Sequence, residues 1–146
     1  MDPAIGQSAR QLPPDCEAFL ALHRPRYLSY ARLHLPDTAA DEAVGAVFEQ
    51  LFTRWRHVLS HPDPAAYAWS LFATRVRARR PPRPWQALSH AEYDAFALHH
   101  LLGYPLPDVA AAMGAEPEAV HSLLRSATVA TALRRAGPVP DPRPGG

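Results

Sequence analysis

Proline limits where this chain can form helices. The 146 residues include 17 prolines, yet four windows contain none, namely 37–61, 65–80, 85–104 and 118–137. Proline lacks a backbone donor and its ring clashes with the preceding helical turn, so these windows are where helices can form. No segment alternates apolar and polar residues with a period of two. The expected fold class is therefore all-α, with two small helical modules, the second a helix-turn-helix.

The first module is expected over residues 16–80. Its clearest pattern is a set of apolar residues at i, i+3, i+4 and i+7 spacing that forms one wide face. This set is Val44, Val47, Phe48, Leu51, Phe52, Trp55, Val58 and Leu59, of which Val44, Val47, Phe48, Leu51 and Trp55 are expected to be buried. Thr38 with Asp41 resembles a capping box, which predicts a helix start near Thr38. Pro25 is expected to kink or divide an earlier helix over 19–35.

Asp63 and Pro64 predict the start of the next helix, which should run to about Arg80. Its expected inner stripe is Trp69, Phe72, Ala73 and Val76. Residues 81–87 then form a stiff linker that no helix can cross, and its Trp85 is expected to anchor on one module.

The second module is expected over residues 88–136. Ser89 with Glu92 forms a second capping box, and the apolar spacing after it continues until Gly103. The expected inner stripe of this helix is Tyr93, Phe96, Ala97, His100 and Leu101. A short helix over 107–113, a turn over 114–116 and a helix opened by Pro117 complete the predicted helix-turn-helix. That last helix bears Val120, Leu123, Leu124 and Ala127.

Composition bounds the class of protein. The chain carries 15 basic residues, all arginine, against 14 acidic ones, and 47% of its residues are apolar, enough for a real core. We expect disordered tails at 1–15 and 137–146. No window resembles a membrane span or a signal peptide, so we expect a cytoplasmic protein without membrane contact. The single cysteine, Cys16, is expected to be buried and inert.

Other constellations predict neither an enzyme nor a cofactor. The chain has no nucleophile elbow and no glycine-rich phosphate loop. His57 and His61 are spaced to share a helix face, but Pro62 follows at once and no carboxylate has matching spacing. We therefore expect exposed histidines without a metal, and no catalytic residue.

The order of these elements resembles a bacterial RNA polymerase sigma factor of the extracytoplasmic-function type, over about residues 16–135. The resemblance lies in the segments 19–31, 40–52, 63–80 and 88–134. It implies that the helix over 40–52 binds RNA polymerase core through Asp41, Glu42, Val44, Phe48, Glu49 and Phe52. It also implies that promoter DNA and a regulatory protein such as an anti-sigma factor are partners. Candidate DNA-binding residues are Arg75, Arg77, Arg79, Arg80, His121 and Arg125.

The chain departs from this family at six positions and in its linker. In the last helix His121 and Leu123 stand where the family is usually basic, which leaves Arg125 alone near the expected groove-facing surface. Gly45 and Ala46 stand where the family usually has a glutamine and an acidic residue, so two polar side chains of the polymerase-binding helix are missing. Thr74 and Ala78 stand where the family usually has Asn and Asp. Amide readout of a base edge needs a donor and an acceptor on one side chain, which threonine supplies only in part, so we expect base-specific reading to be impaired. The seven-residue linker over 81–87 makes recognition of two promoter elements difficult.

Charge separates the two modules. Five arginines, from Arg75 to Arg83, lie within nine residues. They could contact phosphate groups of a nucleic acid. They could instead form a solvated helix end whose positive charge complements the helix dipole. Residues 88–136 carry a net charge of −2 with histidine neutral, whereas a duplex-binding module should be basic. Two functions remain open: a sigma-like transcription regulator, and a sigma-like protein-interaction module that has lost promoter recognition.

Overall fold

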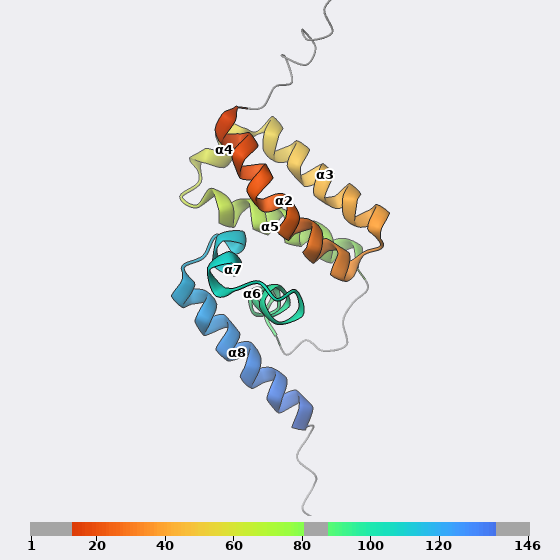
Figure 1. Cartoon of the computed structure of the whole chain (residues 1–146), viewed down its shortest axis with the longest axis vertical. Coiled ribbons are helices and arrows are strands. Elements are labelled where there is room, and N and C mark those ends of the chain that lie inside the picture. Colours follow the sequence, from red (N-terminus) through yellow and green to blue (C-terminus); the bar gives the residue numbers. More distant parts are fainter. Residues whose placement is uncertain (1–12, 81–87, 137–146) are drawn as a thin grey trace, which may run out of the picture. The chain divides into compact units, whose positions relative to one another are not determined.

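The structure, a computed structural model, describes residues 13–80 and 88–136, with side chains through residue 133. These residues form seven α-helices and one π-helix, and no strand occurs among them, so the predicted all-α class is confirmed (Figure 1). Contacts between the helices divide the chain into two compact units, residues 1–80 and 81–146, called unit 1 and unit 2 below. The expected linker and its Trp85 lie outside the described residues, as do residues 1–12 and 137–146.

Unit 1 consists of α2 (Pro14–His34), α3 (Asp37–Thr53), α4 (Trp55–Ser60) and α5 (Pro64–Arg79). The helix α2 starts at Pro14, before the expected boundary at residue 16, because proline suits the first helical position and Asp15 and Glu17 complement the dipole there. Pro25 lies inside α2 without dividing it. Pro25 and Ala21 are both exposed, so the carbonyl that loses its donor can bind water.

Two details of the predicted central helix are wrong. It begins at Asp37 with Pro36 as N-cap and no side-chain capping bond, so Thr38 and Asp41 form no capping box. It also breaks at Arg54 (φ −115°, ψ 32°) between α3 and α4. The Thr53 hydroxyl donates to the Glu49 carbonyl at 2.7 Å, a bond that bends helices. After the break Trp55 and Val58 stay buried while Leu59 is 47% exposed.

The start of α5 is as the sequence predicts. The Asp63 carboxylate accepts a hydrogen bond from the Ala66 N–H at 3.1 Å, and Pro64 occupies the first turn. The predicted inner stripe of α5 is buried. Asp63 and the stripe together fix which side of α5 faces the core and which side carries its arginines.

Aromatic rings fill the core of unit 1. The Tyr27 ring of α2 stacks on the Phe72 ring of α5, with centroids 4.3 Å apart and planes at 20°. Phe48 of α3 contacts Tyr27 at 5.6 Å, and Trp69 lies edge-on to both Tyr27 and Tyr30 at 5.3 and 5.0 Å. These ring contacts hold α2, α3 and α5 together.

Unit 2 consists of α6 (His90–Phe96), a π-helix η1 (Ala97–Leu101), α7 (Leu106–Met113) and α8 (Pro117–Ala136). The capping box at Ser89 and Glu92 is confirmed, with bonds of 2.8 and 3.1 Å. In the π-helix the Leu102 N–H donates to the Ala97 carbonyl at 3.0 Å, five residues back. Gly103 follows at φ 79°.

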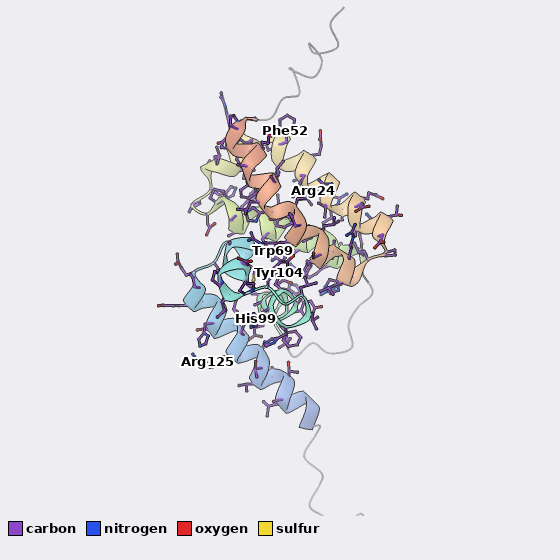
Figure 2. All side chains as sticks on the ribbon, in the orientation of Figure 1. Arg24, Phe52, Trp69, His99, Tyr104 and Arg125 are labelled. Atoms are coloured by element: carbon purple, nitrogen blue, oxygen red, sulfur yellow. The ribbon has the colours of Figure 1, made fainter. Side chains whose placement is uncertain are left out.

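This wider turn corrects the predicted inner stripe of α6. A π-helical turn holds one residue more than the 3.6-residue spacing assumes, so the residues after Ala97 rotate around the helix. Leu98 is fully buried, whereas Leu101 is 51% exposed and His100 is also exposed. The imidazole of His99 donates from Nδ1 to the Tyr104 carbonyl at 2.8 Å, which closes the turn (Figure 2).

The helices α7 and α8 are joined by a turn at Gly114, whose φ of 66° is left-handed. The core of unit 2 is made of small and aliphatic side chains, among them Leu98, Val109, Ala110, Ala112, Val120, Leu124 and Ala127. Leu123, expected on the inner stripe of α8, is half-buried. Over residues 13–80 and 88–136, no helix has the length and apolar content needed to cross a bilayer.

Candidate functional site

The arginines at the end of α5 occupy different environments. Residues 64–80 contain four arginines and no acidic residue. Arg75 and Arg79 are exposed, while Arg77 and Arg80 are half-buried. The Arg79 guanidinium lies 3.4 Å from the Glu42 carboxylate of α3, and the Arg80 guanidinium lies 3.5 Å from Nε2 of His34. The arginines at the end of α5 thus contact side chains of both α2 and α3.

The environment of these arginines bears on whether they contact phosphate or only complement the helix dipole. Arg77 and Arg79 lie in the last turn of α5, where positive charge complements the helix dipole. The Arg79 and Glu42 side chains are 36% and 62% exposed, and an exposed ion pair contributes at most about 1 kcal/mol. Phosphate could therefore displace Glu42 from Arg79 at little cost.

Beside the arginines, α5 presents small side chains. Thr74 and Ala78 are exposed on the same helix as Arg75. Ala78 has no polar atom, and the single hydroxyl of Thr74 lacks the separate donor and acceptor atoms with which an amide reads a base edge. This part of α5 offers charge to a phosphate backbone and little sequence readout.

The candidate polymerase-binding residues of α3 fall into two groups. Asp41, Glu42 and Glu49 are exposed, and Phe52 is half-buried, so these four line the outer side of α3. Figure 2 labels Phe52 on this helix. Val44 is 1% exposed.

Phe48, the other apolar candidate on α3, is 7% exposed, and the guanidinium of Arg24 lies 5.9 Å from its ring centroid. Val44 and Phe48 are therefore core residues, as the apolar face of this helix predicts, which leaves them little surface for the polymerase contacts that the resemblance implies.

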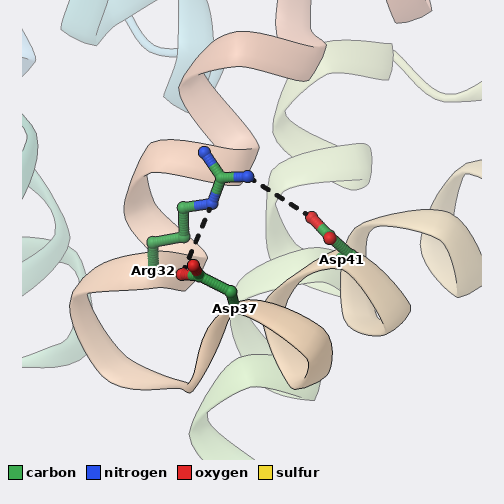
Figure 3. Close-up of polar contacts among 3 residues, drawn as sticks. All are labelled: Arg32, Asp37 and Asp41. Atoms are coloured by element: carbon green, nitrogen blue, oxygen red, sulfur yellow. Dashed lines mark ion pairs between the residues drawn. The ribbon is translucent and has the colours of Figure 1, made fainter.

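An ion-pair network fixes the corner between α2 and α3. Arg32 near the end of α2 contacts the carboxylates of Asp37 at 3.9 Å and Asp41 at 3.6 Å (Figure 3). Asp41 is thus a candidate polymerase contact, and its carboxylate also forms an ion pair across the corner between α2 and α3. Its side chain is 61% exposed, so it remains accessible from solvent.

The DNA-binding candidates of unit 2 lie one turn apart on α8. His121 and Arg125 are both exposed, and Figure 2 labels Arg125 on α8. Further along the helix, Val129 is 55% exposed and Leu133 is 69% exposed. Val129 and Leu133 therefore add exposed apolar surface to α8 between Arg125 and the arginines at 134 and 135.

Sequence reasoning missed a buried polar cluster in unit 1. His23 Nδ1, Tyr27 Oη and Trp55 Nε1 are buried without a hydrogen-bond partner. Phe19 contacts both His23 and Trp55, with ring centroids at 4.4 and 5.5 Å. Burial, and then the charge of Arg26, lower the pKa of His23 to about 4. The aromatic spacing of α2 was the available signal, but it does not reveal which polar atoms lack partners.

Two further pKa shifts follow from burial. Burial raises the pKa of the Tyr27 phenol far above its ordinary value. Burial, helped by the neighbouring Asp15 carboxylate, raises the pKa of the Cys16 thiol. Cys16 is buried, as predicted, and its thiol is held protonated, which is the opposite of a reactive cysteine.

The histidines at 57 and 61 lie closer than their spacing alone requires. Their Nε2 atoms are 3.3 Å apart, and the His61 ring stacks on the Tyr67 ring of α5. Among the residues that the structure describes, no group of three or more His, Cys, Asp or Glu side chains is placed to hold a metal ion.

Comparison with known proteins identifies no family for this chain. No protein-family model, curated protein or solved structure matches the chain.

Proposed function

We propose that this chain is a sigma-factor-like transcription regulator in which unit 1 binds both RNA polymerase core and the DNA phosphate backbone. The observation that carries the proposal is the end of α5, where four arginines without an acidic residue include the exposed Arg75 and Arg79. Clustered arginine on one helix is the electrostatic footprint of nucleic-acid binding. The outer side of α3, with Asp41, Glu42 and Glu49, is the proposed polymerase surface.

Matched double variants test DNA binding in the full chain. Arg75→Ala/Arg79→Ala removes two exposed charges from α5, and Arg54→Ala/Arg56→Ala removes two exposed charges elsewhere in unit 1. Binding to a labelled duplex is measured by fluorescence anisotropy across a salt series. In the α5 variant, the slope of log affinity against log salt should flatten by about 0.9 for each arginine that had neutralised a phosphate. It should stay unchanged in the Arg54/Arg56 variant, and equal slopes in the two variants would contradict the α5 assignment.

A gain-of-binding experiment tests the polymerase surface. Gly45 is exposed on α3, and a Cβ added there meets nothing within 4 Å. Gly45→Gln/Ala46→Asp restores the polar side chains of the resembled family, and Gly45→Ala is the control for helix propensity alone. Retention by immobilised bacterial RNA polymerase core should increase for the double variant and not for the control. If neither full-length chain is retained, the polymerase part of the proposal fails.

A second candidate function has its own support. Residues 88–136 carry a net charge of −2, and the helix that bears His121 and Arg125 also exposes the apolar side chains of Val129 and Leu133. These features favour a sigma-like module that binds a protein, such as a polymerase subunit or an anti-sigma factor, and has lost promoter recognition. Polymerase retention without salt-dependent duplex binding would favour this alternative.

A further inference from the structure

The corner between α4 and α5 brings two imidazoles together. His57 lies in α4, His61 is the residue that caps its C-terminus, and Tyr67 lies in the first turns of α5. The Nε2 atoms of His57 and His61 are 3.3 Å apart, within hydrogen-bond distance of each other, while their ring centroids are 4.9 Å apart. The rings therefore spread away from a close pair of nitrogen atoms, and these nitrogens are the atoms that bind metals.

The distance between the two nitrogens matches one coordination geometry. Zinc binds imidazole nitrogen at about 2.0 to 2.1 Å, and a tetrahedral arrangement then separates two ligand nitrogens by about 3.3 to 3.4 Å. A square arrangement at the same bond length would bring them to about 2.9 Å. The 3.3 Å spacing of His57 and His61 fits the tetrahedral value.

The surrounding side chains and backbone hold both rings in place. Tyr67 stacks on His61, with centroids 3.8 Å apart and planes at 17°, and meets His57 edge-on at 5.7 Å. The Ser60 hydroxyl donates to the His57 carbonyl at 2.6 Å, and the His61 N–H donates to the Val58 carbonyl at 3.2 Å. Rings that are already ordered lose little freedom when an ion binds.

We propose that His57 and His61 form a two-histidine site for a zinc ion, with Tyr67 as a positioning residue. His57 is exposed and His61 is half-buried, so an ion can reach the pair from solvent. Two protein ligands leave two tetrahedral positions for water or for a donor from another molecule. The proposal is independent of the proposed transcription function, since no arginine of α5 takes part in it.

Nuclear magnetic resonance of the histidine side chains in the full chain tests the site directly, with zinc chloride as the probe at neutral pH. We expect the Nε2 resonances of His57 and His61 to shift first and to saturate at one zinc per chain. His57→Gln and His61→Gln should each weaken zinc binding at least tenfold, as expected when one of two ligands is removed. Both side chains reach solvent, so circular dichroism should show an unchanged fold.

The chain contains a matched control pair. The ring centroids of His99 and His100 are 4.7 Å apart, but Nδ1 of His99 is bonded to the Tyr104 carbonyl. His100→Gln should leave zinc affinity unchanged. If zinc shifts His99 and His100 at the same concentration as His57 and His61, or if His57→Gln keeps full affinity, the proposed site is wrong.

Variants at Tyr67 test the positioning role separately from ligation. Tyr67→Phe keeps the stacked ring and should keep zinc affinity. Tyr67→Ala removes the ring and should weaken binding several-fold while both histidine ligands remain. Equal affinity in Tyr67→Ala and Tyr67→Phe would exclude Tyr67 from the site.

Discussion

Both units bury several alanines, but unit 1 also packs aromatic rings from three helices against one another, whereas Tyr93 is the one buried aromatic side chain among the described residues of unit 2. Tyr27, Trp69 and Phe72 bridge the helices of unit 1, while Ala97 and Ala112 stand at fully buried positions of unit 2. Large rings span wide gaps between helices, and alanine lets helices approach closely. The comparison predicts that unit 1 is most sensitive to losing a side chain and unit 2 to gaining one.

The largest effect is expected from Phe72→Ala. Phe72 is fully buried and stacked on Tyr27, so its removal leaves a cavity that costs about 3 to 5 kcal/mol of unfolding free energy. Hydrogen exchange measured helix by helix should show reduced protection in α2, α3 and α5. An equal reduction of protection in α6, α7 and α8 would break the comparison between the units.

Acid should distinguish the units next. The pKa of His23 is about 4 when folded and 6.5 when unfolded, so the unfolded chain binds more protons between these values. The folded state therefore gains stability as pH rises through this range. This gain in unfolding free energy is fully present above pH 6.5 and is lost as pH falls toward 4. It amounts to about 3 kcal/mol.

The described histidines of unit 2 are all partly or fully exposed, so this acid sensitivity belongs to unit 1. His23→Gln should flatten the pH dependence of chemical denaturation between pH 4 and 6.5, whereas the matched His90→Gln in unit 2 should not. A profile that stays steep in His23→Gln would assign the acid sensitivity elsewhere.

A smaller effect is expected from enlarging a buried alanine of unit 2. Ala112 is fully buried and its neighbour Ala111 is exposed. Ala112→Leu should cost about 1 to 3 kcal/mol by overpacking, and Ala111→Leu should be nearly neutral. Thermal unfolding of the two variants provides the measurement, and a neutral Ala112→Leu would show that the core of unit 2 has room to spare.

The smallest effects come from one glycine in each unit, and they have opposite signs. Gly45 is exposed within α3 with open space around it, so Gly45→Ala should stabilise the chain by about 0.5 to 1 kcal/mol. Gly114 has a φ of 66°, so Gly114→Ala should destabilise it by about 1 kcal/mol. Denaturation midpoints that moved in the same direction would contradict one of the two backbone assignments.

Local chemistry explains which parts of the fold were predictable. Asp63 and Ser89 each satisfy backbone donors three residues ahead, so nearby sequence is enough to locate the helix starts. The break at Arg54 and the π-helix at Ala97 lie inside continuous apolar patterns, and no local residue type marks them. The helix α3 starts at Asp37 and not at Thr38, and the Asp37 carboxylate pairs with Arg32 of the preceding helix.

The candidate site was predictable by residue type and not by the pairing of its side chains. Sequence spacing places Arg79 at a helix end, but its pairing with Glu42 depends on how α3 packs against α5. Spacing also puts His57 and His61 on one helix face, while their 3.3 Å approach depends on the α4 terminus and on Tyr67. The burial of Val44 and Phe48 was predictable from the apolar face of their helix, whereas their role as polymerase contacts came from the resemblance alone.

The π-helix at Ala97–Leu101 has a consequence for changes in chain length. A π-helical turn is an α-helical turn with one residue inserted, so deleting one residue there would restore ordinary helical bonding. A deletion inside α8 would instead rotate every following residue by about 100° around the helix axis. Among the described helices, the segment from Ala97 to Leu101 is therefore where this chain should tolerate a single-residue deletion best.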